Sequence, residues 1–191
     1  MSLIKTITAT ALTGFAALGF ASASIATPSI SEVKEGSSEA HGLLVEAIRD
    51  NGVNFIVNDD YCFENEGIMG FYSGQRRALV VCQDNAVKGG GIVAWTANDL
   101  DTLRHEAQHM IQDCISGTNH DHKLAPVYKS PIGLANEVIG AEAIARITET
   151  YRANGASDLV LLLEYEAFAV AALNVPAEQA GDVAGYCGAN R

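Results

Sequence analysis

Apolar positions in the first half of the chain predict one helix followed by short strands. Between residues 39 and 50 they recur at the three- and four-residue spacing of a helix, which Asn51-Gly52 ends. Short runs rich in β-branched and aromatic residues follow at 53–57, 68–72 and 78–82, with turn-forming residues between them. A further run at 92–95 is a candidate edge strand. Together these runs predict a small, mostly antiparallel sheet.

The pattern after Trp95 is helical almost to the end of the chain. Thr96, Asn98 or Asp99 can cap a helix that runs to about Cys114. Later helices are predicted at 131–151, 158–173 and 176–184. A sheet followed by helices is the order of an α+β domain, which is the fold class we expect.

The beginning of the chain has the pattern of an export signal. Lys5 precedes an apolar run from Ile7 to Phe20, and Ala21-Ser22-Ala23 resembles a signal-peptidase site. We therefore expect a signal peptide at 1–23, with a retained amino-terminal anchor as the alternative. Residues 24–38 are rich in Ser, Thr, Pro and Glu and predict a flexible lead-in, which leaves a single domain at 39–191.

Export has two consequences for the mature protein. No later segment reaches the roughly eighteen apolar residues that a spanning helix needs, so we expect no integral membrane segment after cleavage. The expected location is periplasmic or secreted. An oxidising compartment also allows the four cysteines to form two disulfides. We favour Cys62–Cys82, on neighbouring strands of a hairpin, and Cys114–Cys187, from the end of the central helix to the carboxyl terminus; free core cysteines are the alternative.

Charge narrows the choice of partner. The chain has 191 residues, with 12 Lys and Arg against 23 Asp and Glu, and a net charge of −11. Nucleic acids and anionic membranes reward basic patches, so neither is expected as the main partner. Hydrophobic residues make up 48% and charged residues 18%, which is enough apolar material for a folded core.

The segment His105-Glu106-Ala107-Gln108-His109 lies in the middle of the predicted central helix. Residues four apart lie one above the other on a helix, so both imidazoles project from one face and can bind one metal ion. Glu106 lies about 100° around the helix from His105, close enough to hold a metal-bound water without binding the metal. Zinc lowers the pKa of such a water to roughly 7, and the carboxylate can accept its proton during attack on a carbonyl carbon. The pattern therefore predicts peptide hydrolysis.

These five residues and the order of sheet before helix resemble the zincin metallopeptidases, which carry HExxH on an active-site helix. The resemblance implies a zincin-like fold, a bound Zn²⁺ and a peptide or protein substrate. The metzincin extension is absent, because Gln112 and Ile115 occupy the positions of its Gly and His. The resemblance therefore implies a glutamate as third ligand, as in gluzincins.

The segment from Glu164 to Ala167 resembles the second motif, ExxA, of the CAAX-protease and heat-shock membrane gluzincins, in which the Glu binds zinc. It implies Glu164 as the third ligand, with Phe168 in place of that family's Asp. The residues around Glu164 support the same assignment. Glu164 lies in the apolar run 159–173, where a buried carboxylate needs a compensating partner. A zinc ion would be one.

Two other glutamates remain candidates for the third ligand. Glu166 lies about 200° from Glu164 around the helix, so both cannot easily reach one metal. The pair Asn136-Glu137 is similar to the NExxSD motif of thermolysin-like peptidases, with Gly140 and Ala141 in place of its Ser and Asp. Candidates for a further ligand or for stabilising developing charge are His120 and His122 in a polar loop, and Tyr128, Tyr151 and Tyr165.

The sequence thus predicts an exported zinc-dependent peptidase. His105, His109 and Glu164 are the expected metal ligands, and Glu106 is the expected general base and later proton donor. One alternative is a non-catalytic exported module with structural zinc, closed by His120 or His122. Another is a disulfide-stabilised interaction domain without metal. Cleavage specificity and oligomeric state are not encoded in these patterns.

Overall fold

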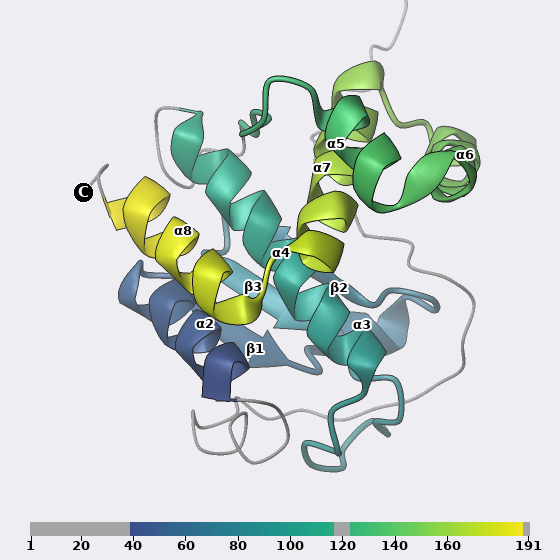
Figure 1. Cartoon of the computed structure of the whole chain (residues 1–191). Coiled ribbons are helices and arrows are strands. Elements are labelled where there is room, and N and C mark those ends of the chain that lie inside the picture. The colour runs from purple at the N-terminus through teal and green to yellow at the C-terminus, as the bar shows by residue number, and fades with distance from the viewer. Residues whose placement is uncertain (1–38, 117–122, 189–191) are drawn as a thin grey trace, which may run out of the picture.

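A computed structural model describes residues 39–116 and 123–188 (Figure 1). In these residues the fold is α+β, as predicted, with a three-stranded sheet and a larger helical part. The strands are β1 (Asn54–Val57), β2 (Gly70–Ser73) and β3 (Ala78–Val81). The helices are α2 (Glu39–Asp50), α3 (Asp60–Glu64), α4 (Ala97–Ile115), α5 (Pro131–Val138), α6 (Gly140–Ala153), α7 (Asp158–Leu173) and α8 (Pro176–Gly188).

The sheet is mixed, with strand order β1-β3-β2, so the prediction of a mostly antiparallel sheet is wrong. β1 runs parallel to β3, with Asn54 opposite Ala78, whereas β2 is antiparallel to β3, with Gly70 opposite Val81. The reason lies in the connections. The helix α3 separates β1 from β2, and the tight turn at 74–77 pairs β2 with β3, which takes the centre.

The candidate strand at 92–95 is not a strand. The Gln83 side chain takes the place of a pairing strand there, because its Nε2 donates to the Val93 carbonyl (2.9 Å) and its Oε1 accepts from the Val93 N–H (3.0 Å). The backbone N–H and C=O of Val93 are therefore both satisfied by one side chain and not by a neighbouring strand.

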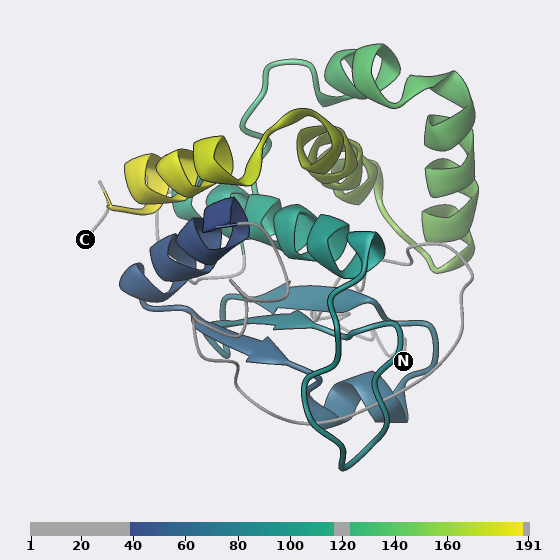
Figure 2. The same cartoon turned by 60° about the horizontal axis from the view of Figure 1, so that its bottom comes forward.

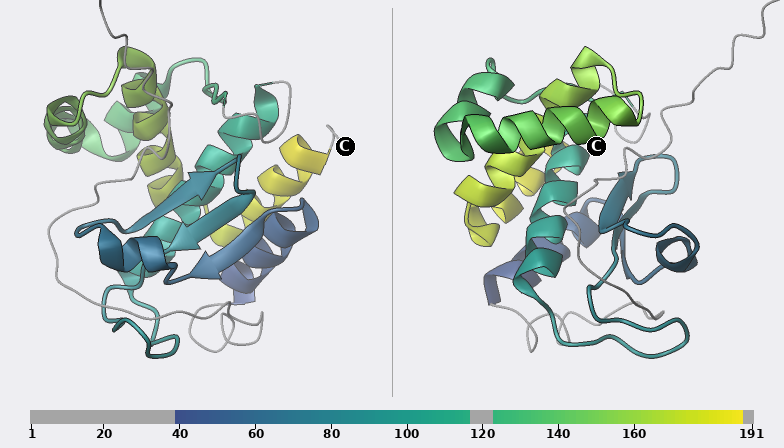
Figure 3. Two further views of the ribbon diagram at one scale, coloured as in Figure 1. Left: turned by 180° about the vertical axis from the view of Figure 1, so that it is seen from behind. Right: turned by 90° about the vertical axis from the view of Figure 1, so that its right-hand side faces the viewer.

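Both faces of the sheet are covered, and β3 is buried along its whole length. Leu79 and Val81 belong to the main core, which the sheet shares with α2, α4 and α8. Ala78 and Val80 face the opposite side, with Phe71 and Cys82. Figure 3 shows this layering, with α3 on the outer face of the sheet and the long helices behind it.

The helix α4 lies between the sheet on one side and helices α7 and α8 on the other (Figure 2). Thr96, one of the three candidate caps, is its N-cap and forms a capping box with Asp99. Gly70 allows β2 to come close to this helix. A Cβ at position 70 would lie 2.6 Å from Thr102 Cγ2 and 3.4 Å from Glu106 Cγ.

The helical half differs from the prediction in two places. The expected helix at 131–151 is two helices, α5 and α6, because Gly140 has a φ of +79°. Glycine adopts that left-handed conformation without steric cost and ends α5. Helix α7 was predicted with its observed bounds, and α8 runs past the expected end to Gly188.

Both predicted disulfides are confirmed. Cys62 is bonded to Cys82 and Cys114 to Cys187, with Cα–Cα distances of 5.6 and 5.0 Å. The reason given for the first pair is wrong, because Cys62 lies in α3 and not on a strand. Two disulfides are consistent with an exported protein.

Within 39–116 and 123–188, no helix has the length and apolarity that a membrane crossing requires. The predicted signal peptide at 1–23 and lead-in at 24–38 lie outside the described residues.

Candidate metal centre

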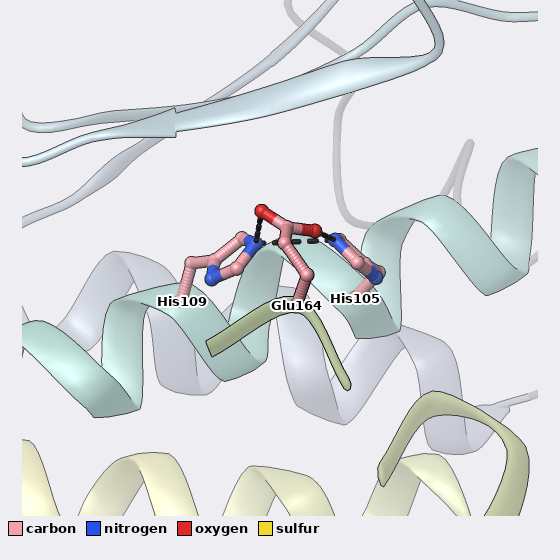
Figure 4. A group of neighbouring side chains, drawn as sticks. All are labelled: His105, His109 and Glu164. Carbon is pink, nitrogen blue, oxygen red and sulfur yellow. Dashed lines mark hydrogen bonds and ion pairs between the residues drawn. The ribbon is translucent and has the colours of Figure 1, made fainter. Parts of the chain in front are cut away.

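The structure brings His105 and His109 of α4 together with Glu164 of α7 (Figure 4). His105 Nε2 lies 3.2 Å from Glu164 Oε2, and His109 Nε2 lies 3.3 Å from Glu164 Oε1. The two Nε2 atoms are 3.1 Å apart. All three side chains are buried, and Glu164 is completely so. The predicted third ligand, Glu164, thus comes from α7, although it lies 55 residues after His109 and 59 after His105 in the sequence.

These spacings fit a metal ion. Zinc binds imidazole nitrogen and carboxylate oxygen at about 2.0–2.2 Å, which places tetrahedral ligands roughly 3.3–3.6 Å apart. The observed spacings of 3.1–3.3 Å lie within a few tenths of an ångström of that range. The donor set of two imidazoles and one carboxylate is one that binds divalent zinc well. The three residues can therefore hold a metal ion with little rearrangement.

The metal-free group is held by charge. Burial alone would raise the pKa of Glu164, but the His109 and His105 imidazoles outweigh it and lower the pKa to about 2. Burial alone would lower the pKa of His109, but the Glu164 carboxylate outweighs it and raises the pKa to about 9. A proton on His109 and a negative charge on Glu164 thus stabilise each other, and a divalent cation would replace that proton.

Glu106 lies beside this group on α4 and is 1% exposed. Burial raises the pKa of its carboxyl, against the opposing effect of the two imidazoles. The backbone N–H of Tyr72, on strand β2, also acts against this rise in pKa. The Oε2 atom of Glu106 has no hydrogen-bond partner among the described residues. A buried oxygen of this kind is costly unless a water or a substrate satisfies it.

The two imidazoles are held in different ways. His109 Nδ1 lies 2.8 Å from Gln112 Oε1, one turn further along α4. His105 Nδ1 has no hydrogen-bond partner among the described residues. The His105 ring instead packs edge-on against Phe168, at a centroid distance of 4.4 Å. Phe168 occupies the position of the ExxA motif's Asp, so an aromatic contact stands where that motif has a carboxylate.

The competing glutamates lie elsewhere. Glu166 is fully buried, but its partners are the Gln108 and Gln112 amides and the Val127 and Tyr128 N–H groups, not the imidazoles. Glu137 is exposed on α5. Neither belongs to the group of potential ligands.

The other candidates do not extend the group within the described residues. All four cysteines are in disulfides, so none is a thiolate ligand. The Tyr165 hydroxyl lies 2.6 Å from Thr148 Oγ1, and Tyr151 packs among α5, α6 and α7. Tyr128 is exposed and does not belong to the group of potential ligands. His120 and His122 lie outside the described residues.

Sequence reasoning missed two contributors to this site. Gln112 could have been found, because it is three residues after His109 and so shares its side of the helix. The Tyr72 N–H carries no sequence signal, because a backbone donor depends only on where the strand lies.

Comparison with known proteins places the chain in a family. A family described as Domain of unknown function (DUF8637) matches residues 37–134, just over half of the chain. The match covers α2, the sheet and α4, with both histidines and Glu106, and ends before α7. No curated protein and no solved structure matches the chain. The chain therefore belongs to the DUF8637 family of domains of unknown function.

Proposed function

We propose that the protein is an exported zinc-dependent peptidase of the zincin type. The observation that carries this proposal is the buried cluster of His105, His109 and Glu164, with ligand atoms 3.1–3.3 Å apart. Beside it lies Glu106, whose Oε2 has no hydrogen-bond partner in the described part of the chain. His105, His109 and Glu164 would hold the ion. Imidazole favours zinc over magnesium or calcium, which prefer oxygen ligands, so zinc is the metal that we infer.

Glu106 has the properties of a general base. A zinc ion bound there would supply an acidified water and would polarise a substrate carbonyl. Glu106 Oε2 is free to take up a proton from that water. Burial keeps the pKa of this carboxyl above its ordinary value, which suits a group that must accept and then release a proton. The same oxygen can then return the proton to the leaving amine.

The non-catalytic alternatives have less support. Structural zinc sites usually close with a fourth protein ligand, often Cys. Among the described residues, no fourth His, Cys, Asp or Glu joins the group, and every cysteine is in a disulfide. A domain with no metal would need another role for two imidazoles and a carboxylate that converge in the core. Peptide hydrolysis accounts for both the three ligands and Glu106.

The test is to measure zinc content and cleavage of a mixed peptide substrate for wild type, Glu106→Gln and His109→Ala. We expect Glu106→Gln to keep its zinc and to lose at least about 100-fold in activity, because it can no longer accept a proton. His109→Ala should lose the zinc. An active Glu106→Gln protein would refute the mechanism. A zinc-bound wild type with no hydrolytic activity would favour the structural-zinc alternative.

A further inference from the structure

Glu166 is the centre of a second buried polar network, which joins α7 to α4 next to the metal ligands. Its Oε1 accepts from Gln108 Nε2 (2.9 Å), Gln112 Nε2 (3.0 Å) and the Val127 N–H (3.0 Å). Its Oε2 accepts from the Tyr128 N–H (2.8 Å). Since the carboxylate is 0% exposed, these four donors replace its hydration. Glu166 thus fixes two side chains of α4 and the backbone at 127–128.

Gln112 connects this network to the metal centre. Its Nε2 donates to the Leu163 carbonyl (3.0 Å) and to Glu166, both of which can only accept. The amide can satisfy both only with its nitrogen on that side, so its oxygen must face His109. An amide oxygen can only accept, so His109 Nδ1 must carry the proton of that bond. The partners of Gln112 therefore determine that His109 carries a proton on Nδ1, so that Nε2 is the nitrogen that faces Glu164.

We propose that Gln112, held by Glu166, is a positioning residue that keeps His109 protonated at Nδ1 and leaves Nε2 to bind the metal. This inference rests on the proposed metal site and adds a part that HExxH does not contain. A partner on the outer nitrogen of a ligating histidine fixes ring orientation and strengthens the ligand. The outer nitrogen of His105, Nδ1, has no hydrogen-bond partner among the described residues, and that ring packs against Phe168, so His109 is the more firmly oriented of the two.

Gln108 provides a matched control. Gln108 and Gln112 both lie on α4, both are buried, and both donate one amide hydrogen bond to Glu166 Oε1. Only Gln112 also bonds to His109. Gln112 also bonds to the Leu163 carbonyl, so the two Leu variants need not be equally stable. A purely structural role for the network predicts that folded Gln108→Leu and Gln112→Leu have similar zinc affinities. A positioning role predicts that only the second weakens metal binding.

The first measurement is the zinc dissociation constant. We expect Gln112→Leu to raise it roughly 10- to 100-fold, and Gln108→Leu to change it by no more than a few fold. Gln112→Glu keeps an acceptor for His109 but faces Glu166 with a like charge. It should restore most of the zinc affinity while lowering the melting temperature. Equal affinities for Gln108→Leu and Gln112→Leu, or a folded Gln112→Glu that binds as weakly as Gln112→Leu, would overturn the proposal.

The second measurement separates this proposal from the proposed function. Histidine-labelled wild type should show a slowly exchanging His109 Nδ1–H resonance with and without zinc, because Gln112 bonds to that atom in either state. The resonance should survive in Gln108→Leu and disappear in Gln112→Leu. A wild type without a protected Nδ1–H contradicts the role of Gln112. A wild type with that resonance but no zinc binding contradicts the proposed function instead.

Discussion

Two glutamates on α7 show how the partners of a buried carboxylate decide its role. Glu164 and Glu166 are each 0% exposed, and each needs groups that replace water. Glu164 meets two imidazole nitrogens, whereas Glu166 meets only N–H donors of amides and backbone. A metal ion can join the first set, because imidazole nitrogens offer lone pairs and amide N–H groups do not. Only Glu164 is therefore suited to be a ligand.

The pair of Glu164 and His109 predicts a pH dependence of the metal-free protein. In the metal-free folded protein the pKa of His109 is about 9, above the ordinary 6.5. The folded state therefore binds the second imidazole proton of His109 more tightly than the unfolded state does. The resulting stabilisation is complete below about pH 6.5 and is lost as pH rises through about 9. Urea unfolding in chelator should show the stability difference between wild type and His109→Gln shrinking across that range. A difference independent of pH contradicts the ion pair.

Single residues also mark the limit of what the sequence reveals. The pair His105 and His109 follows from helical spacing alone, and the apolar surroundings of Glu164 indicated that it needs a partner. The sequence left Glu164, Glu166 and Glu137 as alternatives. Which glutamate reaches the histidines depends on how α7 packs against α4, and a local sequence pattern does not contain this information.

At the scale of elements, the contact between β2 and α4 holds Glu106 in place. Gly70 permits this contact, because a Cβ there would lie 2.6 Å from both Thr102 Cγ2 and the Val80 carbonyl oxygen. The strand can then bring the Tyr72 N–H to the Glu106 carboxylate. The lack of a side chain at Gly70 thus influences the position of Glu106, although Gly70 is not a ligand.

Gly70→Ala should separate β2 from α4. We expect a loss of about 1–3 kcal/mol in unfolding free energy from overpacking, together with reduced peptidase activity. Gly185→Ala is the control, because it lies exposed on α8 with no atom within 4 Å of the added Cβ. It should instead stabilise the helix by about 0.5–1 kcal/mol. Urea denaturation of both variants measures these effects, and an unaltered Gly70→Ala would refute the close contact.

The elements themselves were largely predictable, and the exceptions have local causes. Capping at Thr96 and the apolar run of α7 gave two helices with nearly correct bounds. The break at Gly140 was missed, because glycine also occurs inside helices and only its positive φ ends this one. The strand order was not predicted, because the sequence pattern did not reveal the short helix α3, which separates β1 from β2.

At the scale of the molecule, one disulfide joins α4 to α8 and the other joins α3 to the sheet. Cys114–Cys187 ties the end of α4 to α8 across 73 positions, and Cys62–Cys82 ties α3 to the end of β3 across 20. Replacing Cys114 and Cys187 by Ser should lower the unfolding free energy by about 2–4 kcal/mol. Chain entropy makes this loss about 1 kcal/mol larger than for the other pair. Denaturant titration of both double variants tests this, and the reverse ranking contradicts it.

Zinc content of purified protein is the most direct test of the central claim, that His105, His109 and Glu164 hold a metal ion. It should be measured for wild type, Glu164→Ala and Glu137→Ala, with circular dichroism to show that each is folded. We predict about one zinc per chain in wild type and Glu137→Ala, and far less in Glu164→Ala. A wild type without zinc, or a Glu164→Ala protein that keeps it, would contradict the account.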